Sequence, residues 1–185
     1  MPAYFDFEVS LIGAEPRVWR RFLIHSNTTF MDLHDAIQDA CGWLHSHLFA
    51  FESPEGSAIA GLPHDAGFGE PDPDAAGVRL PVFFKNGANE RCLYTYDFGD
   101  SWEHDVVLRG QVDSPDRFGR RLTDGARAFP LEDCGGLWGY EECVKVAQGY
   151  EGETSAGDAA SLREWLGGWT PEAFDLVATK RSFDR

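Results

Sequence analysis

The stretch that decides the fold lies in the middle of the chain and reads YTYDFGDSWEH, from Tyr94 to His104. Aromatic and β-branched residues, which favour strands, occur over residues 91–96 and 102–109, on either side of the segment 97–101. Between them, Asp, Gly and Ser favour a turn, because Gly tolerates positive φ and Asp or Ser side chains bond nearby backbone N–H groups. The segment therefore predicts an antiparallel hairpin, with Trp102 and His104 on one face of its second strand and Glu103 on the other.

Two further strands are predicted near the N-terminus. Residues 3–12 alternate apolar and polar side chains, as a half-buried strand does, and residues 18–24 form a second β-rich run. Residues 13–16 (GAEP) break the pattern between them, so the two strands are expected to be neighbours.

The clearest predicted helix follows, from about Phe30 to Cys41. Residues 27–29 (NTT) supply N-cap candidates, and Gly42 stands where a C-cap glycine belongs. The apolar residues recur at helical spacing and predict a stripe facing the core. The residues expected on its outer side are polar: Asp32, Asp35, Gln38 and Asp39.

The remaining segments complete an α+β fold. We expect a strand at 47–51, an acidic, Gly- and Pro-rich variable loop at about 53–79, an apolar run of undetermined type at 80–84, and a polar loop at 113–128. Short helices are predicted near 141–147, after Asp158, and from Thr170-Pro171 with Phe174 inside. The expected architecture is one domain, residues 1–185, with a mixed or mainly antiparallel sheet packed by a few short helices.

Charge and composition narrow the class of protein. The chain has 31 acidic and 16 basic residues, a net charge of -15, which argues against direct nucleic-acid binding because phosphate contacts need Lys and Arg. Two arginine groups, at 17–21 and 117–121, are predicted to form solvated faces or ion pairs. No apolar run approaches the roughly 18 residues of a membrane span. Four cysteines without C-x-x-C spacing fit a reducing compartment, so we expect a cytoplasmic protein.

The hairpin has a functional and a structural interpretation. Asp97 and Asp100 beside His104 would suit a divalent metal or an acid–base pair. The same aspartates are also what a tight turn needs for its backbone donors, and the turn chemistry favours this structural interpretation. His45 and His47 are two residues apart, so an extended chain would project both to one side.

A metal site is the second chemical hypothesis. Imidazole is a common ligand of zinc and iron, and three convergent groups are needed. The candidate metal ligands are His34, His47 and His104. A divalent metal is the one cofactor for which the sequence offers candidates, and no other cofactor is predicted.

Several segments together resemble the plasmid pRi ORF-three-like family. They are residues 16–21 (PRVWRR), 33–38 (LHDAIQ), 42–43 (GW), 47–48 (HL), 96–104 (YDFGDSWEH), 132–136 (EDCGG), 138–140 (WGY), 164–168 (EWLGG) and 174–175 (FD). The resemblance runs from about residue 5 to 180, with 53–90 as the variable part. It implies a compact α+β domain, found on plasmids, chromosomes and insertion elements, and sometimes labelled as resolvase-like. A resolvase needs a nucleophile, basic groups and a DNA-binding surface, which this acidic chain does not suggest.

Three functional hypotheses follow. The first is a non-enzymatic module that binds a small molecule or a protein in a cleft. The cleft is predicted to contain Trp43, His47, Tyr96, Asp97, Asp100, Trp102, His104 and Trp138. The second is a metal-dependent hydrolase. It would use some of His34, His47, Asp97, Asp100, His104 and Asp133. The third is an accessory protein of mobile genetic elements.

Overall fold

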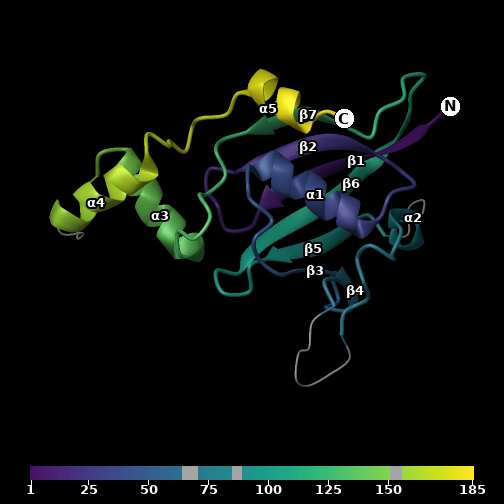
Figure 1. Ribbon diagram of the computed structural model, residues 1–185, viewed down its shortest axis with the longest axis horizontal. Helices are drawn as coiled ribbons and strands as arrows, with labels where there is room; N and C mark the ends of the chain where they lie inside the picture. The colour runs from purple at the N-terminus through teal and green to yellow at the C-terminus, as the bar shows by residue number, and fades with distance from the viewer. Residues whose placement is uncertain (64–70, 85–88, 151–155) are drawn as a thin grey trace.

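A single antiparallel sheet forms the centre of the molecule (Figure 1). In the computed structural model, which describes residues 1–63, 71–84, 89–150 and 156–185, this sheet has seven strands in the order β4-β3-β5-β6-β1-β2-β7. Their bounds are β1 (Ala3–Leu11), β2 (Trp19–His25), β3 (Phe49–Glu52), β4 (Ala58–Gly61), β5 (Arg91–Tyr96), β6 (Trp102–Asp113) and β7 (Arg120–Ala126).

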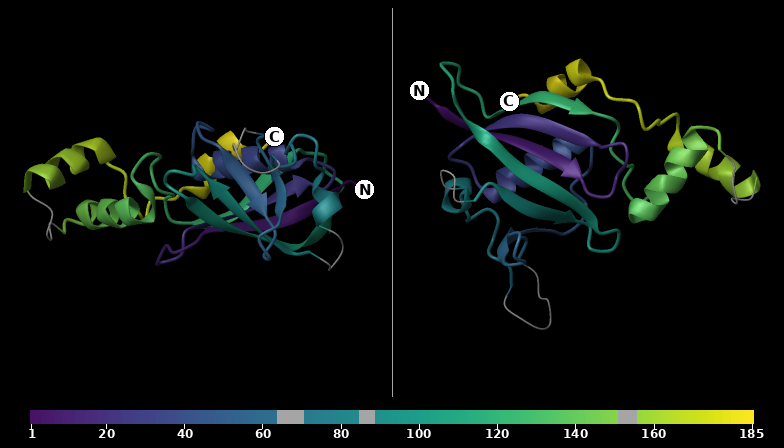
Figure 2. Two further views of the ribbon diagram at one scale, coloured as in Figure 1. Left: turned by 90° about the horizontal axis from the view of Figure 1, so that it is seen from below. Right: turned by 180° about the vertical axis from the view of Figure 1, so that it is seen from behind.

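The helices lie on one face of the sheet and beyond one end of it. Their bounds are α1 (Phe30–Cys41), α2 (Leu80–Phe83), α3 (Gly136–Ala147), α4 (Ala156–Leu166) and α5 (Leu176–Phe183). Figure 2 shows α1 and α5 on the same face, and α3 and α4 as an arm that extends past the sheet. No helix in the described part of the chain is long and apolar enough to cross a membrane. The predicted α+β class, a single domain with an antiparallel sheet, is confirmed.

The central strand β1 is buried on both faces for different reasons. Its apolar residues at the odd positions from 5 to 11 join the core under the helices, whereas Asp6 and Glu8 point to the opposite face. There Arg21 lies 2.6 Å from Asp6, and Glu8 pairs with Arg17 and Arg109. The predicted neighbouring strands, and the ion pairs expected of this arginine group, are therefore present. Long side chains cover the face that carries no helix among the described residues.

The central hairpin forms as its sequence predicts. The Asp97 carboxylate accepts the N–H of Gly99 at 3.0 Å, so this aspartate serves the turn. Trp102 and His104 are buried and Glu103 is exposed, which confirms the expected faces of β6. The side-chain alternation of a strand fixes these positions.

Helix α1 is closed at both ends by the predicted caps. Thr29 is the N-cap and forms a capping box with Asp32, and Gly42 ends the helix with a left-handed backbone, φ 81°. One expected position is wrong, because Gln38 is completely buried rather than on the outer side. Its amide is satisfied inside the protein, where it donates to the Tyr94 hydroxyl at 3.0 Å.

Two arginines of the groups at 17–21 and 117–121 are buried, and of the two Arg120 forms one of the expected ion pairs. Arg20 is 4% exposed, and its guanidinium lies 3.9 Å from the ring of Phe174. Its Nε donates to the carbonyl of Ala40, and its Nη1 donates to three further backbone carbonyls. Arg120 is also buried and pairs with Asp39. Guanidinium groups tolerate burial when their donors are satisfied and aromatic faces cover them.

The structure differs from the predicted segments at four places. Residues 113–128 contain the edge strand β7, which is held by backbone pairing to β2 and has few apolar residues to signal it. Helix α3 begins at Gly136 rather than near 141, and the run at 80–84, whose type was left open, forms the short helix α2. The loop expected at 53–79 contains β4, and its residues 64–70 lie outside the described residues.

The fourth difference concerns the last helix. It was expected to start at Thr170-Pro171, but α5 starts at Leu176 and Phe174 precedes it. The Asp175 side chain accepts the N–H groups of Val177 and Ala178 and so caps the helix there. A capping carboxylate therefore outweighs the proline as the start signal.

Candidate functional site

Three loops meet at one end of the sheet, next to the arm. They are residues 43–48 after α1, the hairpin turn 97–101, and residues 129–135 before α3. Asp100 joins two of them, because its carboxylate accepts the Gly135 N–H at 3.1 Å. Segments distant in sequence therefore bring their polar side chains to one place.

Glu132 ties the first loop to the third. One of its carboxylate oxygens accepts the Tyr96 hydroxyl at 2.6 Å, and the other accepts the Leu44 N–H at 2.9 Å. The same hydroxyl accepts the N–H of Ser46 at 3.0 Å. Burial and the neighbouring Glu132 raise the pKa of Tyr96 well above its ordinary value, so its proton stays in place.

His47, Asp97 and Asp133, one from each loop, form what we call the loop cluster. His47 Nε2 lies 3.2 Å from Asp133 Oδ1 and 3.7 Å from Asp97 Oδ2. Asp97 and Asp133 both have left-handed backbones, with φ of 55° and 60°. Such conformations are uncommon outside glycine, although Asp tolerates them better than most residues.

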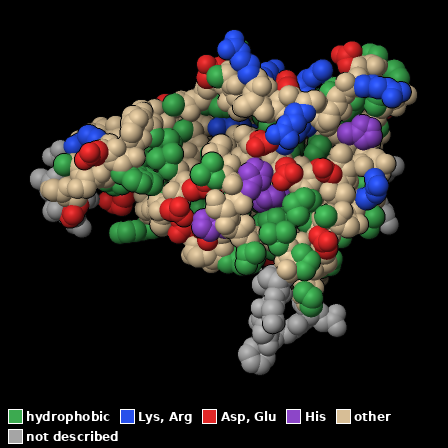
Figure 3. All heavy atoms as spheres, in the orientation of Figure 1, with side chains coloured by type: hydrophobic (Ala, Val, Ile, Leu, Met, Phe, Trp, Pro, Cys, Tyr) green, Lys and Arg blue, Asp and Glu red, His purple; other side chains and the backbone are tan. Residues whose placement is uncertain are grey.

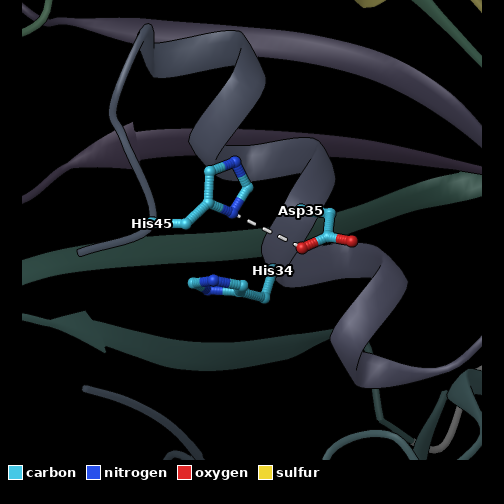
Figure 4. Close-up of side chains that lie close together, drawn as sticks. All are labelled: His34, Asp35 and His45. Carbon is cyan, nitrogen blue, oxygen red and sulfur yellow. Dashed lines mark ion pairs between the residues drawn. The ribbon is translucent and has the colours of Figure 1, made fainter. Parts of the chain in front are cut away.

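A second group, which we call the helix cluster, comprises His34, Asp35 and Asp39 of α1 with His45 from the following loop. Figure 4 shows His45 above the His34 ring and directed toward Asp35, with 3.5 Å between His45 Nδ1 and Asp35 Oδ1. His45 Nε2 lies 3.4 Å from Asp39 Oδ1. Figure 3 shows histidine and acidic side chains gathered on the face that carries α1.

His45 and His47 therefore belong to different clusters and do not point to one side as an extended chain would place them. The reason is the backbone of His45, whose φ is 58°, so the chain turns between the two residues. The alternation that holds in strands does not apply through such a turn.

His34 is a core residue of the helix cluster. Its Nδ1 lies 2.8 Å from the Tyr94 hydroxyl, and its ring stacks on Phe49 with centroids 3.7 Å apart. The hydroxyl accepts the Gln38 amide, which leaves its own hydrogen to donate to Nδ1 and places the imidazole proton on Nε2. Burial, with a smaller contribution from His45, lowers the pKa of His34 to about 3, so the ring is neutral.

His104 lies in the core and belongs to neither cluster. Its Nδ1 donates to the Tyr94 carbonyl at 3.3 Å, and among the described residues its buried Nε2 has no hydrogen-bond partner. Burial lowers its pKa to about 4. The three histidines expected to share a metal are therefore not brought together: only His47 lies in the loop cluster, and His34 lies in the helix cluster.

A cleft of about 830 Å³ opens beside the loop cluster. Its walls come from the end of α1 with the loop that follows it, from residues 128–133, and from the C-terminal segment 165–182. The side chains that shape it are Trp43, Leu44, Asp133, Trp165, Trp169 and Phe174. Asp133 thus belongs to both the loop cluster and the cleft.

Comparison with known proteins gives a consistent result. The model of the plasmid pRiA4b ORF-3-like proteins matches residues 3–178. The chain belongs to this family. The uncharacterized protein y4hQ of Sinorhizobium fredii is 33% identical over an alignment of 148 residues, which covers 76% of this chain and 71% of that protein. The crystal structure of MM3350 from Methanosarcina mazei Go1, a protein of unknown function, superposes with a TM-score of 0.82 at 33% identity and covers 96% of each chain. The association with mobile elements stays a prediction.

The aromatic residues that were expected to line one cleft lie in three different places in this protein. Trp43 lines the cleft and stacks on Tyr96, with ring centroids 5.1 Å apart. Tyr96 and Trp102 are fully buried beneath it, so they support the wall without reaching the surface. Trp138 is 76% exposed on α3 and does not line this cleft.

The glycines before Trp138 allow α3 to approach the hairpin turn closely. A Cβ at Gly136 would lie 2.6 Å from the Asp100 carbonyl oxygen, so only glycine fits where α3 meets the hairpin turn. Sequence reasoning also missed three aromatic residues of the cleft, Trp165, Trp169 and Phe174. Nothing in the local pattern separates them from ordinary core residues, because their common surface exists only after the C-terminal segment folds back.

Proposed function

We propose that this protein is a binding module that holds a small molecule in the cleft beside the loop cluster. The observation that carries the proposal is the cleft itself. Its volume of about 830 Å³ lies within the range of small-molecule sites, and it combines aromatic walls with a few polar groups, as such sites do.

The aromatic walls are held in place by hydrogen bonds. The Trp43 indole donates to the Pro130 carbonyl at 2.8 Å, and the Trp169 indole donates to the Phe129 carbonyl at 3.0 Å. Side chains that are already fixed lose little conformational entropy when a ligand arrives. These contacts support a site formed before binding.

The charges of the walls narrow the ligand class. Carboxylates from Glu132, Asp133 and Asp175 line the cleft, whereas the Asp39 carboxylate in its wall is already paired with Arg120. The buried Arg20 also lines it, but its Nε and Nη1 already donate to backbone carbonyls. This balance disfavours polyanions such as nucleic acids and favours neutral or cationic ligands with an apolar body.

A matched pair of tryptophans tests the proposal. A library of metabolites, nucleotides and short peptides would be screened by thermal shift, and hits titrated by calorimetry into wild type, Trp165→Ala and Trp138→Ala. Trp165 lines the cleft and is 48% exposed, whereas Trp138 is exposed outside it. We expect Trp165→Ala to weaken binding about tenfold or more, since buried aromatic contacts carry much of the binding energy. Trp138→Ala should leave the affinity unchanged.

Two results would overturn the proposal. One is the absence of any hit at millimolar ligand concentration. The other is an equal loss of affinity in both variants, which would place the ligand outside the cleft. Binding of short peptides, without binding of any metabolite or nucleotide, would indicate that the cleft takes a protein partner instead of a small molecule.

A further inference from the structure

We propose that the loop cluster is a binding site for a divalent transition-metal ion, with His47, Asp97 and Asp133 as its protein ligands. One ligand atom of each side chain lies within 4.8 Å of the others. Donor atoms that share an ion at about 2.1 Å lie roughly 3 to 3.5 Å apart. The separations from His47 Nε2, 3.2 Å to Asp133 and 3.7 Å to Asp97, therefore need only small movements to accommodate an ion.

The donor set selects the class of metal. One imidazole nitrogen with carboxylate oxygens suits Mn²⁺, Fe²⁺ or Zn²⁺ better than Ca²⁺ or Mg²⁺, which prefer oxygen donors alone. Three protein ligands leave at least one coordination position open. Because Asp133 also lines the cleft, that position would lie at the edge of the cleft.

The neighbouring charges distinguish this site from the helix cluster. In the helix cluster the Asp39 carboxylate pairs with Arg120 and lies 3.1 Å from Arg185, so two guanidinium groups already neutralise it and would repel a cation. In the loop cluster, across the described residues, the ion pairs of Asp97 and Asp133 are with His47 alone. The carboxylates of the loop cluster are therefore available to a cation.

The turn orients one of the ligands. Asp97 Oδ1 accepts the Gly99 N–H at 3.0 Å, which leaves Oδ2 as the oxygen nearer to His47. Hydrogen bonds of this kind hold a metal-ligating carboxylate in its binding orientation. The turn chemistry and the metal chemistry of Asp97 are thus compatible.

The experiment is a titration of MnCl₂ and ZnCl₂ into chelator-treated, tag-free protein, followed by calorimetry and, for Mn²⁺, by electron paramagnetic resonance. We expect one equivalent to bind. His47→Gln and Asp133→Asn should each weaken binding by at least about tenfold, since even outer-shell partners of a metal site contribute 10- to 100-fold. His45→Gln is the matched control, because His45 also lies between two carboxylates and is similarly exposed, and its variant should bind like wild type.

Binding below stoichiometry in the wild type would overturn the proposal, as would an equal loss in His45→Gln. Asp133 is 74% exposed, so Asp133→Asn decides the question even if His47→Gln folds poorly. The titration contains no organic ligand, and the cleft screen can be run with chelator-treated protein, so the two proposals fail independently. The metal-dependent hydrolase hypothesis would require this ion.

Discussion

The helix cluster and the loop cluster contain the same kinds of side chain, imidazoles beside carboxylates, in very different surroundings. In the helix cluster, His34 is buried under Tyr94 and Phe49, and guanidinium groups neutralise Asp39. In the loop cluster, His47 and its two carboxylates lie on three loops at the edge of a cleft. The two clusters therefore differ in neighbouring charge and burial rather than in residue type, and on our proposal this difference leaves only the loop cluster open to a cation.

Two tyrosines on one strand support the two clusters. Tyr94 and Tyr96 are two apart on β5, so their side chains lie on the same face. Tyr94 bonds His34 and Gln38 inside the core, and Tyr96 bonds Ser46 and Glu132 near the surface. Removing the hydroxyl of Tyr94 or of Tyr96 therefore shows how much each one contributes to the free energy of unfolding.

The largest expected effect is that of Tyr94→Phe. It would leave the nitrogens of His34 and Gln38 buried without a partner, which should lower the free energy of unfolding by about 2 to 4 kcal/mol. Tyr96→Phe should cost about 1 to 2 kcal/mol, because water can reach the groups it leaves. Urea unfolding at pH 7 measures both, and equal losses would contradict the distinction.

The next effect is a pH dependence due to the buried histidine of the helix cluster. Burial depresses the pKa of folded His34 to about 3, so only the unfolded chain takes up a proton near its ordinary pKa of about 6.5. The resulting stability is present above pH 6.5 and is lost as pH falls toward the folded pKa. Between pH 7 and 5.5 we expect His34 to account for about 1 kcal/mol of lost stability.

Urea unfolding at these two pH values, in wild type and His34→Leu, checks the prediction. The variant should lose less stability on acidification than wild type. The pH dependence of stability that remains in the variant should include a contribution from His104, because burial also lowers the pKa of His104, to about 4. An identical pH dependence in wild type and variant would contradict the neutral, buried state of His34.

The smallest expected effect is that of Asp133→Asn on stability. The side chain is largely exposed, and asparagine tolerates the left-handed backbone at this position, so the free energy of unfolding should change by less than about 0.5 kcal/mol. Asp39→Asn should cost more, because it leaves the buried guanidinium of Arg120 without its carboxylate. Thermal unfolding of both variants, with wild type as reference, tests whether the loop cluster contributes little to stability.

Short-range signals in the sequence determined much of the fold. The caps of α1, the turn at 97–101 and the alternation in β5 and β6 depend on neighbouring residues, and the structure contains all of them. The segments whose secondary structure was not predicted lack such signals. The edge strand β7 has little apolar content and is held by backbone pairing to β2.

The sequence by itself predicted His34, His47 and His104 as the metal ligands, and it named Asp97 and Asp133 only among the possible residues of a hydrolase. It did not show that His47 meets these two aspartates, or that His34 and His104 lie elsewhere. Tertiary structure decided those points, because convergence depends on how distant loops pack and on single backbone angles such as φ 58° at His45. It also decided the cleft, whose walls come from three segments far apart in the chain. Periodicity and capping act within a few residues and can be read from the order of side chains, whereas burial, neighbouring charge and a shared surface exist only once the whole chain has folded.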